Sequence, residues 1–98
     1  MIYKFKTKAA GDLIMLGPNG DAFLRVIGRE PAAQGILEPA DMDAALQAIE
    51  RAIAQDEAQR RRAGPGAPPG VTPRQRLWPM VEMLRRAQAA AQVIVWGV

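Results

Sequence analysis

The residues best suited to chemistry are five arginines in a 17-residue stretch without an acidic residue: Arg60, Arg61, Arg62, Arg74 and Arg76. Guanidinium groups bind phosphates with paired hydrogen bonds, so this cluster is suited to nucleic acid or another polyanion. No aromatic side chain is interleaved among the arginines, and no recognised nucleic-acid motif is present. The simpler interpretation is a solvated helix end followed by a loop.

Trp78 lies two residues after Arg76 and is followed by Pro79. Tryptophan and arginine supply much of the binding energy at protein interfaces, so Trp78 is a candidate anchor for a protein partner. The alternative is a tryptophan packed against the sheet or a neighbouring helix. The candidate binding residues are therefore Arg60, Arg61, Arg62, Arg74, Arg76, Trp78 and Arg85.

Two further groups are weaker candidates. Glu38, Asp41 and Asp43 carry oxygen ligands of the kind that Mg²⁺ and Ca²⁺ prefer, but helix capping explains them more simply. Residues 17–21 (Gly-Pro-Asn-Gly-Asp) form a glycine-flanked stretch that lacks the spacing of a phosphate-binding loop, so a plain turn is favoured. We predict neither a metal site nor a cofactor.

Three missing residue types restrict catalysis. The chain contains no His, no Cys and no Ser, so the common nucleophile–base pairs and the ligands of structural zinc are absent. The remaining acid–base groups are carboxylates, lysines and Tyr3. We therefore predict a non-enzymatic protein, with a carboxylate-based enzyme as the weakest hypothesis.

Charge divides the chain into two halves. Residues 1–57 hold six basic and nine acidic groups, whereas residues 58–98 hold seven arginines and a single acid, Glu82. Such a division is typical of a surface for an anionic partner, or of an acidic half that meets the basic half of a second copy. A GC-rich genome, which favours Arg codons, also accounts for part of the arginine excess.

Alternating aromatic residues predict a strand over 2–7, and 8–12 is expected to be a connection. The apolar run 13–16 predicts a second strand buried on both faces, and 17–20 predicts a turn. Residues 21–28 fit a short helix better than the second arm of a hairpin. Residues 35–38 are consistent with a very short strand.

Two long helices are predicted next. Asp41 is the expected N-cap of the first, whose apolar face holds Met42, Leu46, Ile49 and Ile53. Asp56/Arg60 and Glu57/Arg61 have the spacing of ion pairs, and Gly64 ends the helix. Thr72-Pro73 begins the second helix, which either kinks near Trp78 or starts anew at Pro79.

The loop between these helices, residues 63–71, holds three Gly and three Pro and is predicted to be flexible. Residues 93–96 close the chain as an apolar strand that should join the N-terminal pair. The expected fold is a small single α+β domain over 1–98. In it, a mainly antiparallel sheet of three or four short strands is covered on one face by two long helices and one short helix.

Thirty large apolar residues make a thin core, so such a domain gains from association through helix faces or strand edges. A homodimer or a protein partner is therefore expected, with nucleic acid as a less favoured partner. No apolar run approaches the length of a membrane span, and the N-terminus lacks a signal-peptide core, so no membrane association is predicted.

Several segments resemble a family of short proteobacterial proteins known as the domain of unknown function 1840. They are residues 8–15, 35–39, 76–84 and 93–98. The resemblance implies a free-standing cytoplasmic bacterial protein and carries no activity to transfer. Our leading hypothesis is a non-enzymatic interaction module that self-associates or binds a protein partner. The alternative is polyanion binding through the basic 58–98 half.

Overall fold

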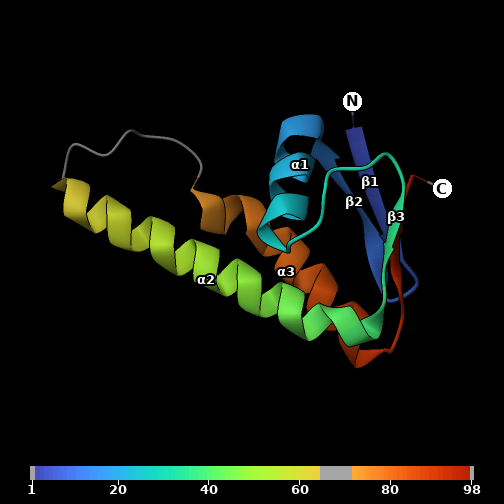
Figure 1. The fold of residues 1–98 in the computed structure, drawn as a ribbon. Coiled ribbons are helices and arrows are strands. Elements are labelled where there is room, and N and C mark those ends of the chain that lie inside the picture. The colour runs from blue at the N-terminus through green and yellow to red at the C-terminus, as the bar shows by residue number, and fades with distance from the viewer. Residues whose placement is uncertain (1, 65–71, 98) are drawn as a thin grey trace.

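The computed structural model describes residues 2–64 and 72–97, with the side chain of Ala63 left out. Figure 1 shows seven elements in the order predicted for an α+β domain. They are β1 (Ile2–Thr7), β2 (Ala10–Leu16), α1 (Gly17–Val26), β3 (Gly35–Leu37), α2 (Pro39–Ala63), α3 (Pro73–Ala89) and β4 (Ile94–Trp96). The predicted loop at 63–71 falls mainly on residues 65–71, which lie outside the described part of the chain.

The four strands form one antiparallel sheet in the order β2-β1-β4-β3. The C-terminal strand β4 joins the N-terminal pair in one sheet, as predicted. Its neighbour in that pair, which the sequence left open, is β1, and Phe5 lies opposite Trp96. On its other side β4 pairs with β3, where Gly35 is opposite Trp96. The two ends of the sequence therefore meet in the centre of the sheet, and β2 and β3 form its two edges.

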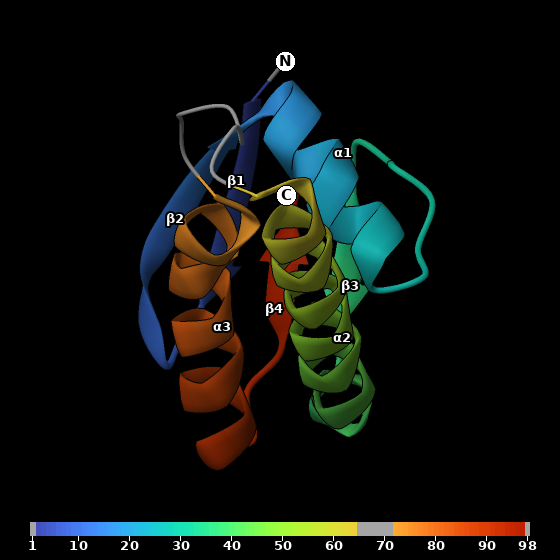
Figure 2. The ribbon, with the colours of Figure 1, turned by 90° about the vertical axis from the view of Figure 1, so that its left-hand side faces the viewer.

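One face of the sheet is covered and the other is bare. Figure 2 shows all three helices on the same side of the strands. The side chains that point to this side are buried, among them Tyr3, Phe5, Met15, Ile94 and Trp96. The prediction that β2 is buried on both faces was wrong. Its side chains alternate, and Ile14 and Leu16 are exposed because no element covers the outer face.

Helix α1 begins earlier than predicted. Residues 17–20 are its first turn and not a separate turn, because Pro18 suits the start of a helix, where its missing N–H is not needed. Asp21 consequently lies beyond the first turn. The predicted end was right: Gly28 has a positive φ of 82°, and the N–H groups of Gly28 and Arg29 bond back to α1.

Helix α2 starts at Pro39 with Glu38 as its N-cap, so the prediction of Asp41 as the N-cap was wrong. Asp41 is the third residue of the helix, and its Oδ2 accepts a hydrogen bond of 3.3 Å from the Glu38 N–H. Asp41 thus still contributes to the cap, from inside the helix. The predicted apolar face is confirmed, with Met42, Ile49 and Ile53 buried and Gly64 as the C-cap.

Helix α3 is capped by Thr72, whose Oγ1 accepts from the Gln75 N–H at 3.2 Å while its own N–H donates to Gln75 Oε1 at 2.9 Å. The helix continues through Pro79, so of the predicted alternatives a separate N-terminal turn is wrong. Proline leaves the Gln75 carbonyl without its helical donor. Gln75 is exposed, so water can satisfy that carbonyl.

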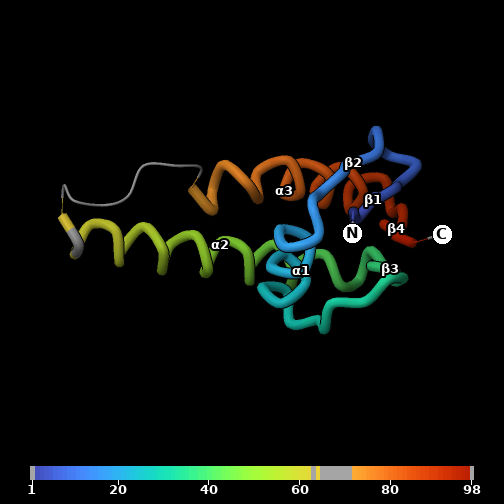
Figure 3. Tube along the Cα trace, turned by 90° about the horizontal axis from the view of Figure 1, so that it is seen from above, coloured from blue at the N-terminus to red at the C-terminus, as the bar shows by residue number. Residues whose placement is uncertain are grey.

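Helices α2 and α3 lie side by side, as Figure 3 shows from above. A helical wheel drawn from Thr72 predicts one apolar arc, formed by Leu77, Met80, Val81, Leu84, Ala87 and Ala91. The structure buries all of these except Ala91, which is exposed because it lies past the end of α3, and it also buries Met83. Within residues 2–64 and 72–97, none of the helices is long and apolar enough to cross a membrane.

Phe5 is the centre of the core. Its ring centroid lies 5.5 Å from that of Phe23, 5.6 Å from that of Trp96 and 5.9 Å from that of Tyr3. These contacts join the centre of the sheet to α1 and to β4. Burial of four aromatic rings against one another supplies much of the apolar area in a domain this small.

Candidate interaction surface

The structure brings together four of the seven predicted binding residues. Arg61, Arg74, Trp78 and Arg85 line one surface pocket of about 420 Å³ between α2 and α3. Glu50 and Glu57 lie in the same pocket. The other three predicted residues are elsewhere: Arg60 and Arg62 on the last turn of α2, and Arg76 on a different side of α3.

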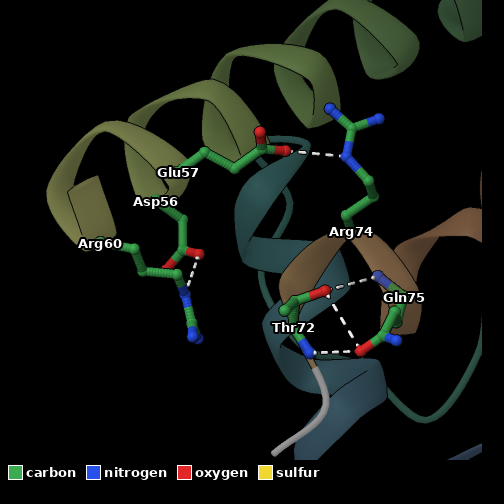
Figure 4. A network of polar contacts seen from close by, with 6 residues as sticks. All are labelled: Asp56, Glu57, Arg60, Thr72, Arg74 and Gln75. Carbon is green, nitrogen blue, oxygen red and sulfur yellow. Dashed lines mark hydrogen bonds and ion pairs between the residues drawn. The ribbon is translucent and has the colours of Figure 1, made fainter. Parts of the chain in front are cut away.

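Several of these arginines hold carboxylates of their own chain (Figure 4). The predicted pair of Asp56 and Arg60 is present, with Arg60 Nε 2.7 Å from Asp56 Oδ2. Glu57 does not pair with Arg61 as predicted. Its Oε1 accepts from Arg74 Nε at 2.7 Å, so this pair joins α2 to the first turn of α3. Arg74 and Arg60 are thereby partly neutralised.

Trp78 is 42% exposed, so it is not packed in the core, whereas Trp96 is 2% exposed. The guanidinium carbon of Arg85 lies 5.7 Å from the Trp78 ring centroid, within the range of a cation–π contact. Arg85 Nη2 also lies 3.8 Å from Glu50 Oε1. The tryptophan therefore remains available as an anchor, although one neighbouring arginine already contacts it.

The acidic candidates point to separate partners. Asp41 Oδ2 lies 3.4 Å from Arg29 Nη2, and Asp43 Oδ1 accepts from Gln88 Nε2 at 3.0 Å. In the stretch 17–21, the carboxylate of Asp21 accepts a hydrogen bond from the Tyr3 hydroxyl. That bond, followed by burial and by the Asp21 charge, raises the pKa of Tyr3 above its ordinary value of 10.0.

Sequence reasoning missed the most exposed apolar residues of the described chain. Ile2, Ile14 and Leu16 are 64%, 61% and 63% exposed, and the register places Ile2 directly opposite Leu16 on the outer face. We call these three residues together with the unpaired side of β2 the β2 margin. The signal in the sequence was the position of Ile14 and Leu16 in an alternating strand, which the continuous apolar run concealed.

A groove follows the β2 margin on the side of α3. One part, a pocket of about 510 Å³, touches all four consecutive residues from Leu13 to Leu16 and reaches inward to all three helices. Its helix residues include Ala22 and Phe23 of α1, Ala52 and Asp56 of α2, and Arg76, Leu77 and Pro79 of α3. A second part of about 280 Å³ continues along residues 10–13 and along Pro79, Glu82 and Arg86. Successive strand residues point to opposite faces, so a groove that reaches all four runs along the strand edge.

The protein-family comparison gives one match: the family model described as a domain of unknown function, DUF1840, matches residues 1–96. No curated protein and no solved structure matches the chain. The comparisons therefore identify a family without attaching a substrate, a ligand or a partner to any residue.

Proposed function

The chain belongs to the DUF1840 family, and since that family has no described activity, we propose from the geometry that the protein is a non-catalytic interaction module of the cytoplasm that binds protein through the β2 margin. Two features support the non-catalytic part. The sequence lacks His, Cys and Ser, and the titratable residues around the larger grooves are either paired or exposed.

The observation that carries this proposal is an apolar, unpaired strand edge. An edge strand presents free backbone N–H and C=O groups, and folded proteins usually protect such edges with Lys, Pro or a very short strand. β2 has seven residues and contains neither Lys nor Pro. Its exposed Ile14 and Leu16 add apolar area beside those groups, which is the chemistry of a surface that another protein covers.

The proposal is tested by photo-crosslinking in the cells that produce the protein. The photoreactive residue p-benzoylphenylalanine replaces Ile14, whose side chain points to solvent from β2. We expect one discrete crosslinked product, which mass spectrometry identifies either as a second copy or as another protein.

The matched control places the same photoreactive residue at Gln47. This residue is exposed on α2, outside the sheet and far from β2 in sequence. A second control adds Leu16→Lys to the chain that carries the crosslinker, which should remove the product by placing a charge in the contact. The absence of any discrete product, or the same products from position 47, would contradict the proposal.

We propose polyanion binding as a second candidate function, because Arg61, Arg74 and Arg85 gather with Trp78 around one pocket. Two of these arginines pair with Glu57 and Glu50, which lowers the positive charge that the pocket presents. Titration with a fluorescent single-stranded oligonucleotide tests it. Binding should weaken steeply with salt and with Arg61→Gln, since phosphate contacts release counterions. Binding that is absent at low salt removes this candidate.

A further inference from the structure

The two parts of the groove beside β2 meet at Pro79 of α3. Pro79 and Leu13 are the two residues that line both parts, so they mark where the parts join. Arg76 lies three residues before Pro79 on α3 and Glu82 lies three residues after it. Residues three apart on a helix occupy neighbouring positions on one face, so both charges flank Pro79.

These two charges have no ion-pair partner among the described residues. Arg76 makes only a hydrogen bond of 3.4 Å, from its Nη1 to Asn19 Oδ1, and Glu82 is in none of the ion pairs. Both residues are exposed. This contrasts with Arg74, Arg60 and Arg85, each of which has a carboxylate within 4 Å in its own chain.

A twofold axis near Pro79 would bring each of these charges opposite its complement. In a twofold-symmetric dimer, if residue i of one copy meets residue j of the other, then j also meets i. With the axis at Pro79, the position three residues before it faces the position three residues after it. Arg76 then meets the partner's Glu82, and Glu82 meets the partner's Arg76.

The strand edge fits the same axis. Two copies of β2 related by a twofold axis run antiparallel, which is the pairing that two equal edges make with each other. We place the axis beside Ile14, the residue next to the shared Leu13, so that Leu13 of each copy lies opposite Met15 of the other. The single acid of β2, Asp12, is already 3.6 Å from Lys4 Nζ of its own chain.

We propose that the partner of the β2 margin is a second copy of this chain, joined edge to edge through β2 and helix to helix through α3. The sheet then continues across the axis as eight strands, and two equivalent Arg76–Glu82 ion pairs flank the contact. This inference rests on the proposed function, in that it names the protein which that surface binds. Figure 2 shows β2 at one margin of the molecule, with α3 in front of it.

The first test measures the mass of the purified protein by size exclusion with light scattering. We expect twice the chain mass of 10.6 kDa. Arg76→Glu alone and Glu82→Arg alone each place like charges at both contacts, and each should weaken dimerisation on the order of tenfold or more. A wild-type protein that stays monomeric at every concentration measured overturns the inference.

Mixing the two variants provides the decisive result. In a mixed dimer the Arg76→Glu chain and the Glu82→Arg chain have opposite charges at both contacts, so the mixture should regain the dimer that neither variant forms alone. Arg86→Glu alone is the control, since this chain keeps both Arg76 and Glu82 and should dimerise as the wild type does. A mixture that remains monomeric, or an Arg76→Glu or Glu82→Arg chain that remains dimeric alone, places the interface elsewhere and overturns the inference.

An engineered disulfide locates the axis independently. The sequence has no cysteine, so Ile14→Cys introduces the only thiol. Directly opposed residues of antiparallel strands have Cα atoms within the range that a disulfide spans. Oxidation should convert this variant to a covalent dimer, and the equally outward-facing Ile36→Cys on β3 should stay monomeric under denaturing conditions. Equal crosslinking at both positions overturns the inference, and circular dichroism confirms that each variant is folded.

The mass measurement and the crosslinking in cells together distinguish self-association from binding of another protein. If the purified protein is monomeric while position 14 captures a different protein in cells, then the β2 margin still binds protein and only the identity of the partner is wrong. If neither experiment gives a product, both are wrong.

Discussion

The two edges of the sheet are built differently. The β3 edge has only three residues, and the segment before it is tied to the strand next to it. Trp96 Nε1 donates to the Ala32 carbonyl at 3.1 Å, and Gln34 Nε2 donates to the Gly97 carbonyl at 3.0 Å. The β2 edge has seven residues and ends in an apolar run. Its side-chain link to β1 is the exposed ion pair of Asp12 and Lys4, at 3.6 Å.

This difference shows where the fold is self-sufficient. A short strand such as β3 offers few free backbone groups. The side-chain hydrogen bonds between its preceding segment and the β4 region stabilise this edge further. The longer β2 edge keeps its free groups beside exposed apolar side chains, at a cost in solubility. We therefore expect the β2 edge, and not the β3 edge, to bind another protein.

The largest effect is expected at the two tryptophans. Trp96→Ala removes a buried ring that contacts Phe5 and bonds to Ala32, so the free energy of unfolding should fall by about 3–5 kcal/mol. Trp78→Ala is the matched control, because that residue is 42% exposed and lies outside the core, and should cost less than about 1 kcal/mol. Urea denaturation followed by circular dichroism measures both. Equal losses would show that the α3 surface is as tightly packed as the closed edge.

One glycine in each edge strand compares how tightly the two edges of the sheet are packed. A Cβ on Gly35 of β3 would overlap the Trp96 ring, whereas a Cβ on Gly11 of β2 meets nothing within 4 Å. Gly35→Ala should therefore destabilise the fold by about 1–3 kcal/mol, the usual cost of overpacking. Gly11→Ala should be neutral within about 0.5 kcal/mol. A neutral Gly35→Ala would mean that Trp96 moves freely and that the closed edge is loose.

The hydrogen bond between Tyr3 of β1 and Asp21 of α1 makes the stability of the fold depend on pH. Because the folded protein raises the pKa of Tyr3, the folded state holds this proton more tightly than the unfolded state does. Its contribution to stability is thus complete below about pH 10 and is lost as pH rises from there through the raised pKa. Denaturation between pH 7 and pH 11 should show this loss.

Tyr3→Phe is the control for that titration. It should remove the decline that Tyr3 causes above pH 10, and at neutral pH it should cost about 1–3 kcal/mol because a carboxylate loses its hydrogen bond. A decline of the same size in the Tyr3→Phe variant would assign the titration to the lysines and exclude Tyr3 as its source.

Local patterns in the sequence predicted the elements but not their surroundings. The spacing of Met42, Ile49 and Ile53 fixes the buried face of α2, because helical periodicity depends only on near neighbours. The exposure of Ile14 depends instead on which face of the sheet the helices cover, and that is set by packing between elements far apart in sequence. For the same reason Glu57 was assigned to Arg61 on its own helix, while its partner is Arg74 on the next.

The smallest change in stability should accompany a complete change in assembly. Ile14→Thr and Leu16→Thr place β-branched residues, which suit strands, on an exposed strand face, so each should alter the unfolding free energy of the monomer by less than about 0.5 kcal/mol. The same pair removes the apolar area beside the free edge, so the protein should become monomeric.

In a dimer the melting temperature rises with protein concentration, because association stabilises the folded state by mass action. We therefore expect concentration-dependent melting in the wild type and in the control Ile36→Thr, and melting independent of concentration in the double variant. If all three melt alike, the open edge of β2 contributes nothing to assembly, and the contrast between the two edges is only one of length.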